Sequence, residues 1–265
     1  MNVSLFSQSL FSLDLSQAIA TTAQIGFPAI ELACIKPHFD LTTAQKEPGC
    51  IADRIEEAGL AVSALSLFSS FTDPSCLEEQ IVAAETYIRL APLVRTKLLK
   101  VTPGAPGSAQ ATEAHWQSLS KALDRLIPVS EEVGVQLAFE THMRQLTDTL
   151  ASSQRLMEMV SAGSTGLTVD FLNMAFAGES MPEVIRVLGD RMLHTHVKNG
   201  TIDANGGWHF EALDTGLIDY AVLLKSVRDA GYTGYLSIEC LGGKAAQMPA
   251  QTARRDLKIL NDCLA

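Results

Sequence analysis

Short apolar segments alternate along the whole chain with longer segments of helical spacing. The apolar segments, which we expect to be strands, are Asn2–Ser7, Ala29–Ala33, Ala61–Phe68, Lys97–Thr102, Val135–Glu140, Gly166–Asp170, Leu193–Val197 and Gly234–Glu239. Short, continuously apolar strands that alternate with helices are typical of a parallel sheet covered by helices. About eight strand–helix pairs over this length predict a single (β/α)8 TIM barrel that spans residues 1–265.

The helical segments begin and end at recognisable signals. We expect helices at Ser16–Ile25, Thr43–Ala58, Thr112–Val133, Thr147–Ser161, Met181–Leu188, Leu217–Ala230 and Gln247–Cys263, and another from a cap at Asp73 toward Leu93. Gly26 follows the first of these helices, and Pro48-Gly49 interrupts the second. A doubly wound open sheet is the alternative, but its first turn is usually rich in glycine. Here that turn reads S-Q-S-L-F-S, without glycine, which favours the barrel.

The composition argues against several classes of protein. Of the 265 residues, 47% are hydrophobic and 19% are charged, as in an ordinary globular domain. The formal net charge of −10 disfavours a nucleic-acid partner, because phosphate contacts need clustered Lys and Arg. No apolar run approaches a membrane span, and the N-terminus lacks the basic region of a signal peptide. The five cysteines are odd in number and scattered, which indicates reduced thiols in a cytoplasmic protein.

Four chemically reactive residues stand at the ends of four predicted strands. They are Glu140, Asp170, His196 and Glu239. Barrel active sites lie at the carboxyl ends of the strands, so these side chains are expected to converge. Three carboxylates with one imidazole suit Mn²⁺, Mg²⁺ or Co²⁺ better than a structural zinc site, which prefers thiolates. The sequence therefore predicts a divalent-metal site at the barrel mouth.

The segment Arg191–Asn199, reading R-M-L-H-T-H-V-K-N, adds to this site. Alternation along a strand puts His194, His196 and Lys198 on one face. Two imidazoles and an amine are costly to bury without partners. A metal ion or an anionic substrate would provide such partners.

Five segments together resemble the xylose-isomerase-like TIM barrel superfamily of sugar phosphate isomerases and epimerases. They are Gly134–His142, Gly166–Asn173, Leu193–Asn199, Gly207–Tyr220 and Gly231–Glu239, so that the resemblance covers essentially the whole chain. It implies that Glu140, Asp170, His196 and Glu239 bind one divalent ion, with Zn²⁺ also acceptable, and that the two glutamates are the catalytic acid–base pair. The implied reaction is isomerisation or epimerisation of a small ketose or related polyol ketone, by proton transfer through an enediolate.

The chain departs from the superfamily pattern at three places. Many members have a histidine where this chain has Asn173, and many have an aspartate where it has Asn199. Ketose 3-epimerases place an arginine shortly after the metal histidine, whereas residues 201–205 contain none. The last difference counts against a close match to that subfamily.

Six further residues are predicted to bind the substrate. They are His142, Asn173, Lys198, His194, His38 and Trp208. His142 would hold a hydroxyl beside Glu140, and Lys198 would stabilise oxyanion charge. His194 is expected to support the metal histidine rather than to bind the ion itself. Trp208 lies in the long loop after the seventh strand, where an aromatic wall would suit a sugar.

Other functions share parts of this pattern. A metal-dependent dehydratase of the inosose or dehydroshikimate type would use the same metal site, with Lys198 protonating the leaving hydroxyl. An apurinic endonuclease of the superfamily needs more metal ligands and more phosphate affinity than a chain with six histidines and net charge −10 provides. A non-catalytic binding barrel would leave the four strand-end residues unexplained. We expect a sugar or cyclitol as the partner, no nucleic acid and no membrane, and leave a homodimer or a homotetramer open.

Overall fold

The computed structural model describes residues 1–161 and 163–265. Parallel strands form a closed barrel in the order β1-β10-β7-β6-β5-β4-β3-β2. Their bounds are β1 Asn2–Phe6, β2 Ala29–Ala33, β3 Ala61–Leu67, β4 Leu98–Val101, β5 Gln136–Glu140, β6 Thr165–Asp170, β7 Met192–Val197 and β10 Tyr235–Ile238. The barrel closes because β1 pairs with both β10 and β2, with Leu5 opposite Ile238 and Phe6 opposite Glu31. The prediction of a (β/α)8 TIM barrel is confirmed.

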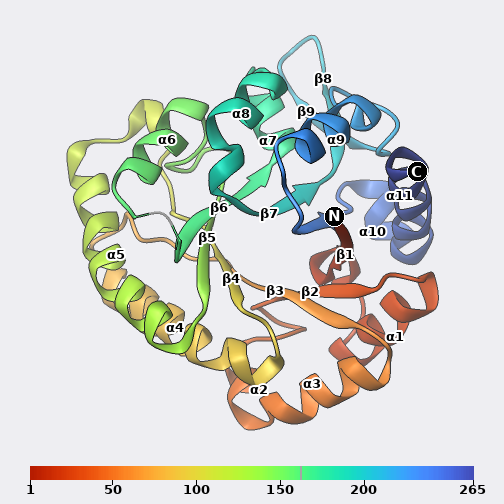
Figure 1. Cartoon of the computed structure of the whole chain (residues 1–265), viewed down its shortest axis with the longest axis horizontal. Helices are drawn as coiled ribbons and strands as arrows, with labels where there is room; N and C mark the ends of the chain where they lie inside the picture. The colour runs from red at the N-terminus through yellow and green to blue at the C-terminus, as the bar shows by residue number, and fades with distance from the viewer. Residues whose placement is uncertain (162) are drawn as a thin grey trace.

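Helices surround the barrel as an outer layer (Figure 1). Their bounds are α1 Leu15–Ile25, α2 Leu41–Lys46, α3 Pro48–Glu57, α4 Leu77–Leu90, α5 Glu113–Val133, α6 Leu150–Glu158, α7 Phe171–Phe176, α8 Met181–Leu188, α9 Tyr220–Asp229, α10 Gly243–Gln247 and α11 Pro249–Leu264. Short 3₁₀ turns occur at Ser7–Leu10, Ala91–Val94, Ser108–Gln110 and Gly189–Arg191. Helix α1 has recognisable start and stop residues. Asp14 and Gln17 form a capping box at its start, and Gly26 ends it at φ 105°. Among the described residues, no helix is long and apolar enough to cross a membrane.

The hydrophobic core lies mainly between the strands and the helices. Outward-facing side chains such as Leu5, Leu32, Phe139 and Ile238 are fully buried there. Burial of each such side chain stabilises the fold by about 1.5–3 kcal/mol. The inward-facing side chains alternate with these and are largely polar near the mouth of the barrel. This polar interior is where the four predicted metal ligands meet.

Three local features differ from the sequence-based expectation. Helix α4 begins at Leu77 and not after Asp73, because the Asp73 carboxylate accepts hydrogen bonds from Ser75 within a local turn. A short helix, α7, follows β6 directly and is capped by Asp170, which accepts from the Asn173 N–H. The loop after β7 contains an antiparallel hairpin of β8 (Asn199–Ile202) and β9 (Trp208–Glu211). This hairpin stands beside the barrel mouth and positions Trp208.

Candidate metal centre and active site

The four predicted metal ligands converge at the carboxyl end of the barrel. Nδ1 of His196 lies 3.1 Å from Glu140 Oε1, 3.9 Å from Asp170 Oδ2 and 4.0 Å from Glu239 Oε2. Their residues are 0%, 3%, 0% and 6% exposed in that order, so the site excludes bulk water. Glu140, Asp170 and His196 each offer a ligand atom within 4.8 Å of the other two. These three residues can therefore offer two carboxylate oxygens and one imidazole nitrogen to one ion, and Glu239 Oε2 lies next to them, 4.0 Å from His196 Nδ1.

The Lys198 ammonium bridges two of the same carboxylates. Its Nζ lies 2.6 Å from Asp170 Oδ2 and 2.5 Å from Glu239 Oε2. Burial alone would lower the pKa of Lys198, but Asp170 and Glu239 outweigh it and raise that pKa. Burial raises the pKa of Asp170 in spite of this neighbour. Lys198 is thus the common positively charged partner of Asp170 and Glu239.

The balance of charge in the cluster fits a divalent ion. Four buried carboxyl groups (Glu31, Glu140, Asp170 and Glu239) face two buried ammonium groups (Lys100 and Lys198), so the acidic side chains outnumber the lysines. Burial alone would lower the pKa of His196, but Glu31 and Glu140 raise it to about 10. The surplus of carboxylates around His196 is the cause of this raised pKa. Hard oxygen donors with one imidazole are the ligands that divalent catalytic ions prefer.

Glu31, which the sequence analysis overlooked, contacts His196, the predicted metal-binding histidine, from the opposite side. Its carboxylate contacts His196 Nε2 at 3.1 Å and His194 Nε2 at 2.9 Å, and it accepts a 2.5 Å hydrogen bond from Ser237. Both imidazoles lower the pKa of Glu31 well below its usual range, although burial opposes them. The contact at Nε2 leaves Nδ1 of His196 facing the carboxylates, as is usual for a metal-binding histidine. Glu31, His194 and His196 are also close enough to bind an ion themselves, but these hydrogen bonds account for their packing without one.

A second buried lysine, Lys100 on β4, was also missed. Its Nζ lies 2.7 Å from Glu140 Oε2, and both side chains are almost fully buried. Burial favours the neutral form of Glu140, but Lys100 and His196 outweigh it and lower the pKa of Glu140 well below its usual value. The same ammonium lies 4.8 Å from the ring of Phe68, and Phe6 stacks on His196 at 5.1 Å. The charged residue within the apolar run L-L-K-V was the available sequence signal.

Asn199, where many members of the superfamily have an aspartate, makes hydrogen bonds that need an amide. Its side-chain amide donates to the carbonyls of Leu213 and Ile218 and accepts from the N–H groups of Gly200 and Ile218. An aspartate could not donate the first two bonds. Asn199 thereby ties the base of the β8–β9 hairpin to the chain that leads into α9.

The predicted substrate contacts have different surroundings. The His142 Nδ1 lies 2.9 Å from the Met143 carbonyl. The Asn173 amide donates to the Thr141 carbonyl at 3.0 Å, while its buried Oδ1 has no partner among the described residues. That oxygen is an acceptor available close to Asp170.

His38 and Trp208 make contacts with protein. His38 is buried, with Nδ1 3.1 Å from Ser7 Oγ and Nε2 3.3 Å from the Leu13 carbonyl, so both ring nitrogens are used. Trp208 stacks on Phe176 with ring centroids 5.3 Å apart and an interplanar angle of 8°. Binding of substrate by either residue stays a prediction.

A profile of the family described as "Xylose isomerase-like TIM barrel" matches residues 19–263. The chain belongs to this family. An inosose dehydratase from Lacticaseibacillus casei is 25% identical over 164 residues, covering 57% of this chain and 55% of that enzyme. The chain therefore aligns with only about half of this curated relative's length.

Two solved structures show the same fold. A structure of L-ribulose 3-epimerase has a TM-score of 0.80 at 20% identity and covers 99% of this chain and 94% of that one. A structure of the IOLI protein with a bound zinc atom has a TM-score of 0.85 at 16% identity and covers 99% of this chain and 98% of that one. The similar proteins are thus named as a dehydratase and as an epimerase, so similarity alone does not select the reaction.

Proposed function

We propose that the protein is a divalent-metal-dependent isomerase or epimerase of a polyhydroxylated ketone. The observation that carries the proposal is the placement of Glu140 and Glu239. They come from β5 and β10, on either side of the strand that bears His196, and each contacts its own buried ammonium. Two carboxylates that approach one site from two sides are the arrangement that two-base proton transfer needs.

Glu140, Asp170, His196 and Glu239 would hold the ion. When bound there, a divalent ion would act as a Lewis acid on the substrate's carbonyl and neighbouring hydroxyl, making the carbon between them more acidic. The chain's own residues supply the remaining chemistry. Burial favours the neutral form of Glu140, but the Lys100 ammonium, 2.7 Å from Glu140 Oε2, lowers the pKa of this carboxyl group and so favours the ionised form, which accepts a proton. The buried surroundings exclude water that would otherwise compete for that proton.

In the proposed reaction one glutamate removes a proton from the substrate carbon and the other returns one. Return to the opposite face of the same carbon gives epimerisation, and return to the adjacent carbon gives isomerisation. Lys198 stands beside Glu239 and would stabilise negative charge that develops on the substrate oxygen. His142, next to Glu140, would hold a substrate hydroxyl.

Dehydration is the second candidate, and two observations favour it. The buried Lys198 ammonium is a proton donor close to both Asp170 and Glu239, where it could release a leaving hydroxyl as water. The relative from Lacticaseibacillus casei is named an inosose dehydratase. In this reaction only one glutamate removes a proton, and the lysine becomes indispensable.

Proton NMR in D₂O with Mn²⁺, ketoses and inososes tests both candidates. An isomerase or epimerase incorporates deuterium at the reacting carbon and forms an isomer, while Lys198→Met leaves exchange largely intact. Glu140→Gln and Glu239→Gln should each lose isomer formation, and Glu158→Gln on the outer helix α6 serves as the matched control. A product that absorbs in the near ultraviolet, with no isomer formed and with turnover lost in Lys198→Met, would select the dehydratase. Absence of both reactions across the panel would refute the two proposals.

A further inference from the structure

One arginine at the barrel mouth differs from nearly all others in the chain in the partners of its guanidinium group. Arg144 lies in the loop between β5 and α6, four residues after Glu140, and its side chain is exposed. Arginines elsewhere pair with acids, as Arg125 does with Glu78 and Glu85, or donate to carbonyls. In residues 1–161 and 163–265, the Arg144 guanidinium contacts neither a carboxylate nor another hydrogen-bond acceptor, a condition shared only with Arg254 on α11. All of its N–H donors therefore remain free.

The backbone holds Arg144 in a conformation that few side chains adopt. Its φ is 60°, in the left-handed region that favours glycine. The residue lies within a turn in which the Gln145 N–H donates to the His142 carbonyl at 3.2 Å. Gly104, in the loop after β4, donates its N–H to Gln145 Oε1 at 3.0 Å, and its carbonyl accepts from the Leu146 N–H at 3.0 Å. Strain that neighbouring bonds enforce is characteristic of functional loops.

An aromatic wall connects Arg144 with the buried site. The guanidinium carbon lies 4.8 Å above the Trp208 ring, and Trp208 stacks on Phe176 of α7. Phe176 in turn packs edge-on against Phe210 at 6.3 Å, and the Lys198 Nζ lies 5.9 Å from the Phe210 ring. Stacking on an aromatic face restrains the guanidinium plane and leaves the N–H groups at its edge free for a ligand. The wall thus runs from the proposed reaction centre to an unpaired cation at the rim.

We propose that Arg144 binds a compact oxyanion, either a carboxylate or a phosphate, that the ketone substrate carries away from its reacting carbonyl. This inference rests on the proposed function, because it assumes that the ketone occupies the metal site. The two interior ammonium groups are already paired with Glu140, Asp170 and Glu239, so neither is free to bind such a group. A chain of net charge −10 repels anions in general, and a dedicated guanidinium would offset this repulsion. Its planar fork binds such an oxyanion through two parallel hydrogen bonds.

Three ketoses that differ only at carbon 6 test the proposal: D-fructose, D-fructuronate and D-fructose 6-phosphate. Their affinities for the Mn²⁺-loaded protein would be measured by calorimetry and by the fluorescence of Trp208, with Trp208→Phe assigning the signal. We expect the wild type to bind at least one anionic ketose about tenfold more tightly than D-fructose or better. Arg144→Gln should remove this preference and change the affinity for D-fructose by less than about twofold, and Arg144→Lys should retain part of it. Arg254→Gln, the matched exposed arginine, should leave all three affinities unchanged.

The outcomes separate this inference from the proposed function. An equal loss for D-fructose and both anions in Arg144→Gln would overturn it in favour of a structural role for the Arg144–Trp208 stack. A wild type that binds neither anion, or has no preference for them, also overturns it. If an anion binds through Arg144 but no ketose in the panel exchanges deuterium or turns over, the subsite stands and the proposed function fails. The anion that binds more tightly identifies the substrate's charged group as carboxylate or phosphate.

Discussion

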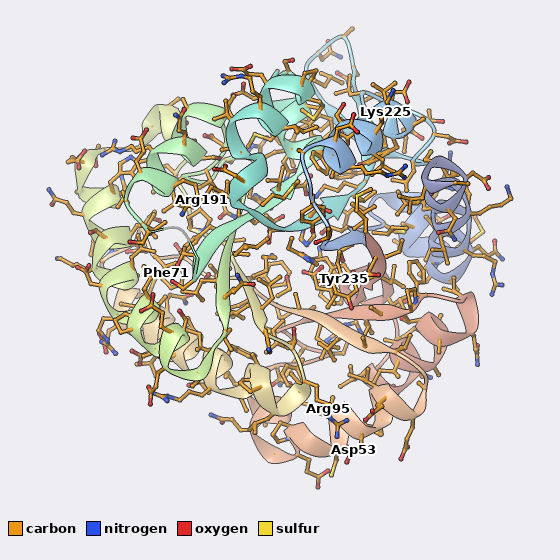
Figure 2. All side chains as sticks on the ribbon, in the orientation of Figure 1. Asp53, Phe71, Arg95, Arg191, Lys225 and Tyr235 are labelled. Carbon is orange, nitrogen blue, oxygen red and sulfur yellow. The ribbon has the colours of Figure 1, made fainter. Side chains whose placement is uncertain are left out.

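Two groups of charged side chains in this barrel have the same chemistry and opposite surroundings. On the outer helices and turns, Arg95 pairs with Asp53 and Glu56, and Arg125 pairs with Glu78 and Glu85. Figure 2 shows Arg95 and Asp53 near the periphery of the molecule, where their side chains are 51% and 56% exposed. In the barrel mouth, the side chains of the buried cluster are at most 6% exposed. The distances in the two groups are similar, so geometry alone does not distinguish them.

The difference in exposure decides what each group contributes. Exposed pairs stay hydrated and are screened by salt, so they add little to stability. Removing charges from water is costly, and a buried pair only offsets that cost when its geometry is good. A chain that needed stability alone would do as well with apolar residues in the barrel interior. The buried cluster is therefore better explained by chemistry, and strongly shifted pKa values inside a mouth support that interpretation.

The largest expected loss of stability follows from removing Glu31, the common partner of two buried imidazoles. Glu31→Ala leaves His194 and His196 without their common acceptor and Ser237 without its own. We expect the free energy of unfolding of the metal-free protein to fall by about 3–5 kcal/mol, as when one member of a buried charged network is lost. Urea unfolding in the presence of EDTA measures it.

The control for this change is Glu56→Ala, which removes an acid of the exposed group. It should leave the urea midpoint nearly unchanged, because its side chain is 72% exposed. Equal losses for Glu31→Ala and Glu56→Ala would show that burial does not determine the contribution of these charges.

Glu31 also shows which kind of contact cannot be predicted from the sequence. The convergence of four side chains could be predicted because each lies at or near the end of a strand, and strand ends in a barrel meet: Glu140, Asp170, His196 and Glu239. Glu31 contacts a histidine 163 positions away, and the pairing depends on which strands face each other across the barrel. No periodicity within β2 encodes that contact.

Local elements at the mouth were hard to predict for another reason. Strands β8 and β9 have only four residues each, and the Asn205-Gly206 pair between them is a turn signal that also occurs in plain loops. Helix α7 has six residues and begins directly at a strand end, so it has no separate start signal. The long, regular elements could be predicted, whereas the short ones depend on tertiary contacts.

The second prediction concerns the interior lysine that the sequence analysis missed. Lys100→Met should lower kcat/KM by about 10- to 100-fold, because Glu140 loses the ammonium that keeps it ionised. Since Lys100 lowers the pKa of Glu140, its removal should move the acidic limb of the pH–rate profile to higher pH. Steady-state kinetics over pH on a substrate found in the NMR panel measures both effects.

Lys97→Met is the control, since this residue lies just before β4 and is exposed. It should leave both kcat/KM and the acidic limb in place. An unchanged acidic limb in Lys100→Met would refute the role assigned to this lysine, even if the rate fell.

The third prediction concerns pH and the metal. The pKa of His196 is raised to about 10 in the metal-free protein, so binding of an ion at Nδ1 must displace a proton at neutral pH. Affinity for Mn²⁺ should rise with pH, by about tenfold per unit between roughly pH 7 and 9. The folded-state pKa lies above the unfolded value, so protonated His196 stabilises the metal-free protein fully below about pH 6.5. That contribution is lost as the pH rises through 10.

Calorimetric titration with Mn²⁺ in buffers of different ionisation enthalpy counts the released protons. His209→Gln is the control, because His209 is exposed and pairs with Asp203 away from the cluster. It should leave the proton count unchanged. Binding without proton release would contradict the protonated state of His196.

The smallest loss of stability should come from Arg125→Ala, although the Arg125 guanidinium pairs with two glutamates on the surface. Its guanidinium donates to Glu78 Oε1 at 2.9 Å and to Glu85 Oε1 at 2.8 Å, bridging α5 and α4. Side-chain exposures of 42% for Arg125 and 74% for Glu78 leave these groups hydrated. We expect Arg125→Ala to cost at most roughly a quarter of the loss caused by Glu31→Ala, and to cost still less at high salt. Urea unfolding of both variants at low and high NaCl compares them directly.

The Glu31→Ala loss should hardly respond to salt, since ions do not reach the barrel interior. A salt-independent loss in Arg125→Ala as large as that in Glu31→Ala would mean that ion-pair geometry, and not exposure, separates the two groups.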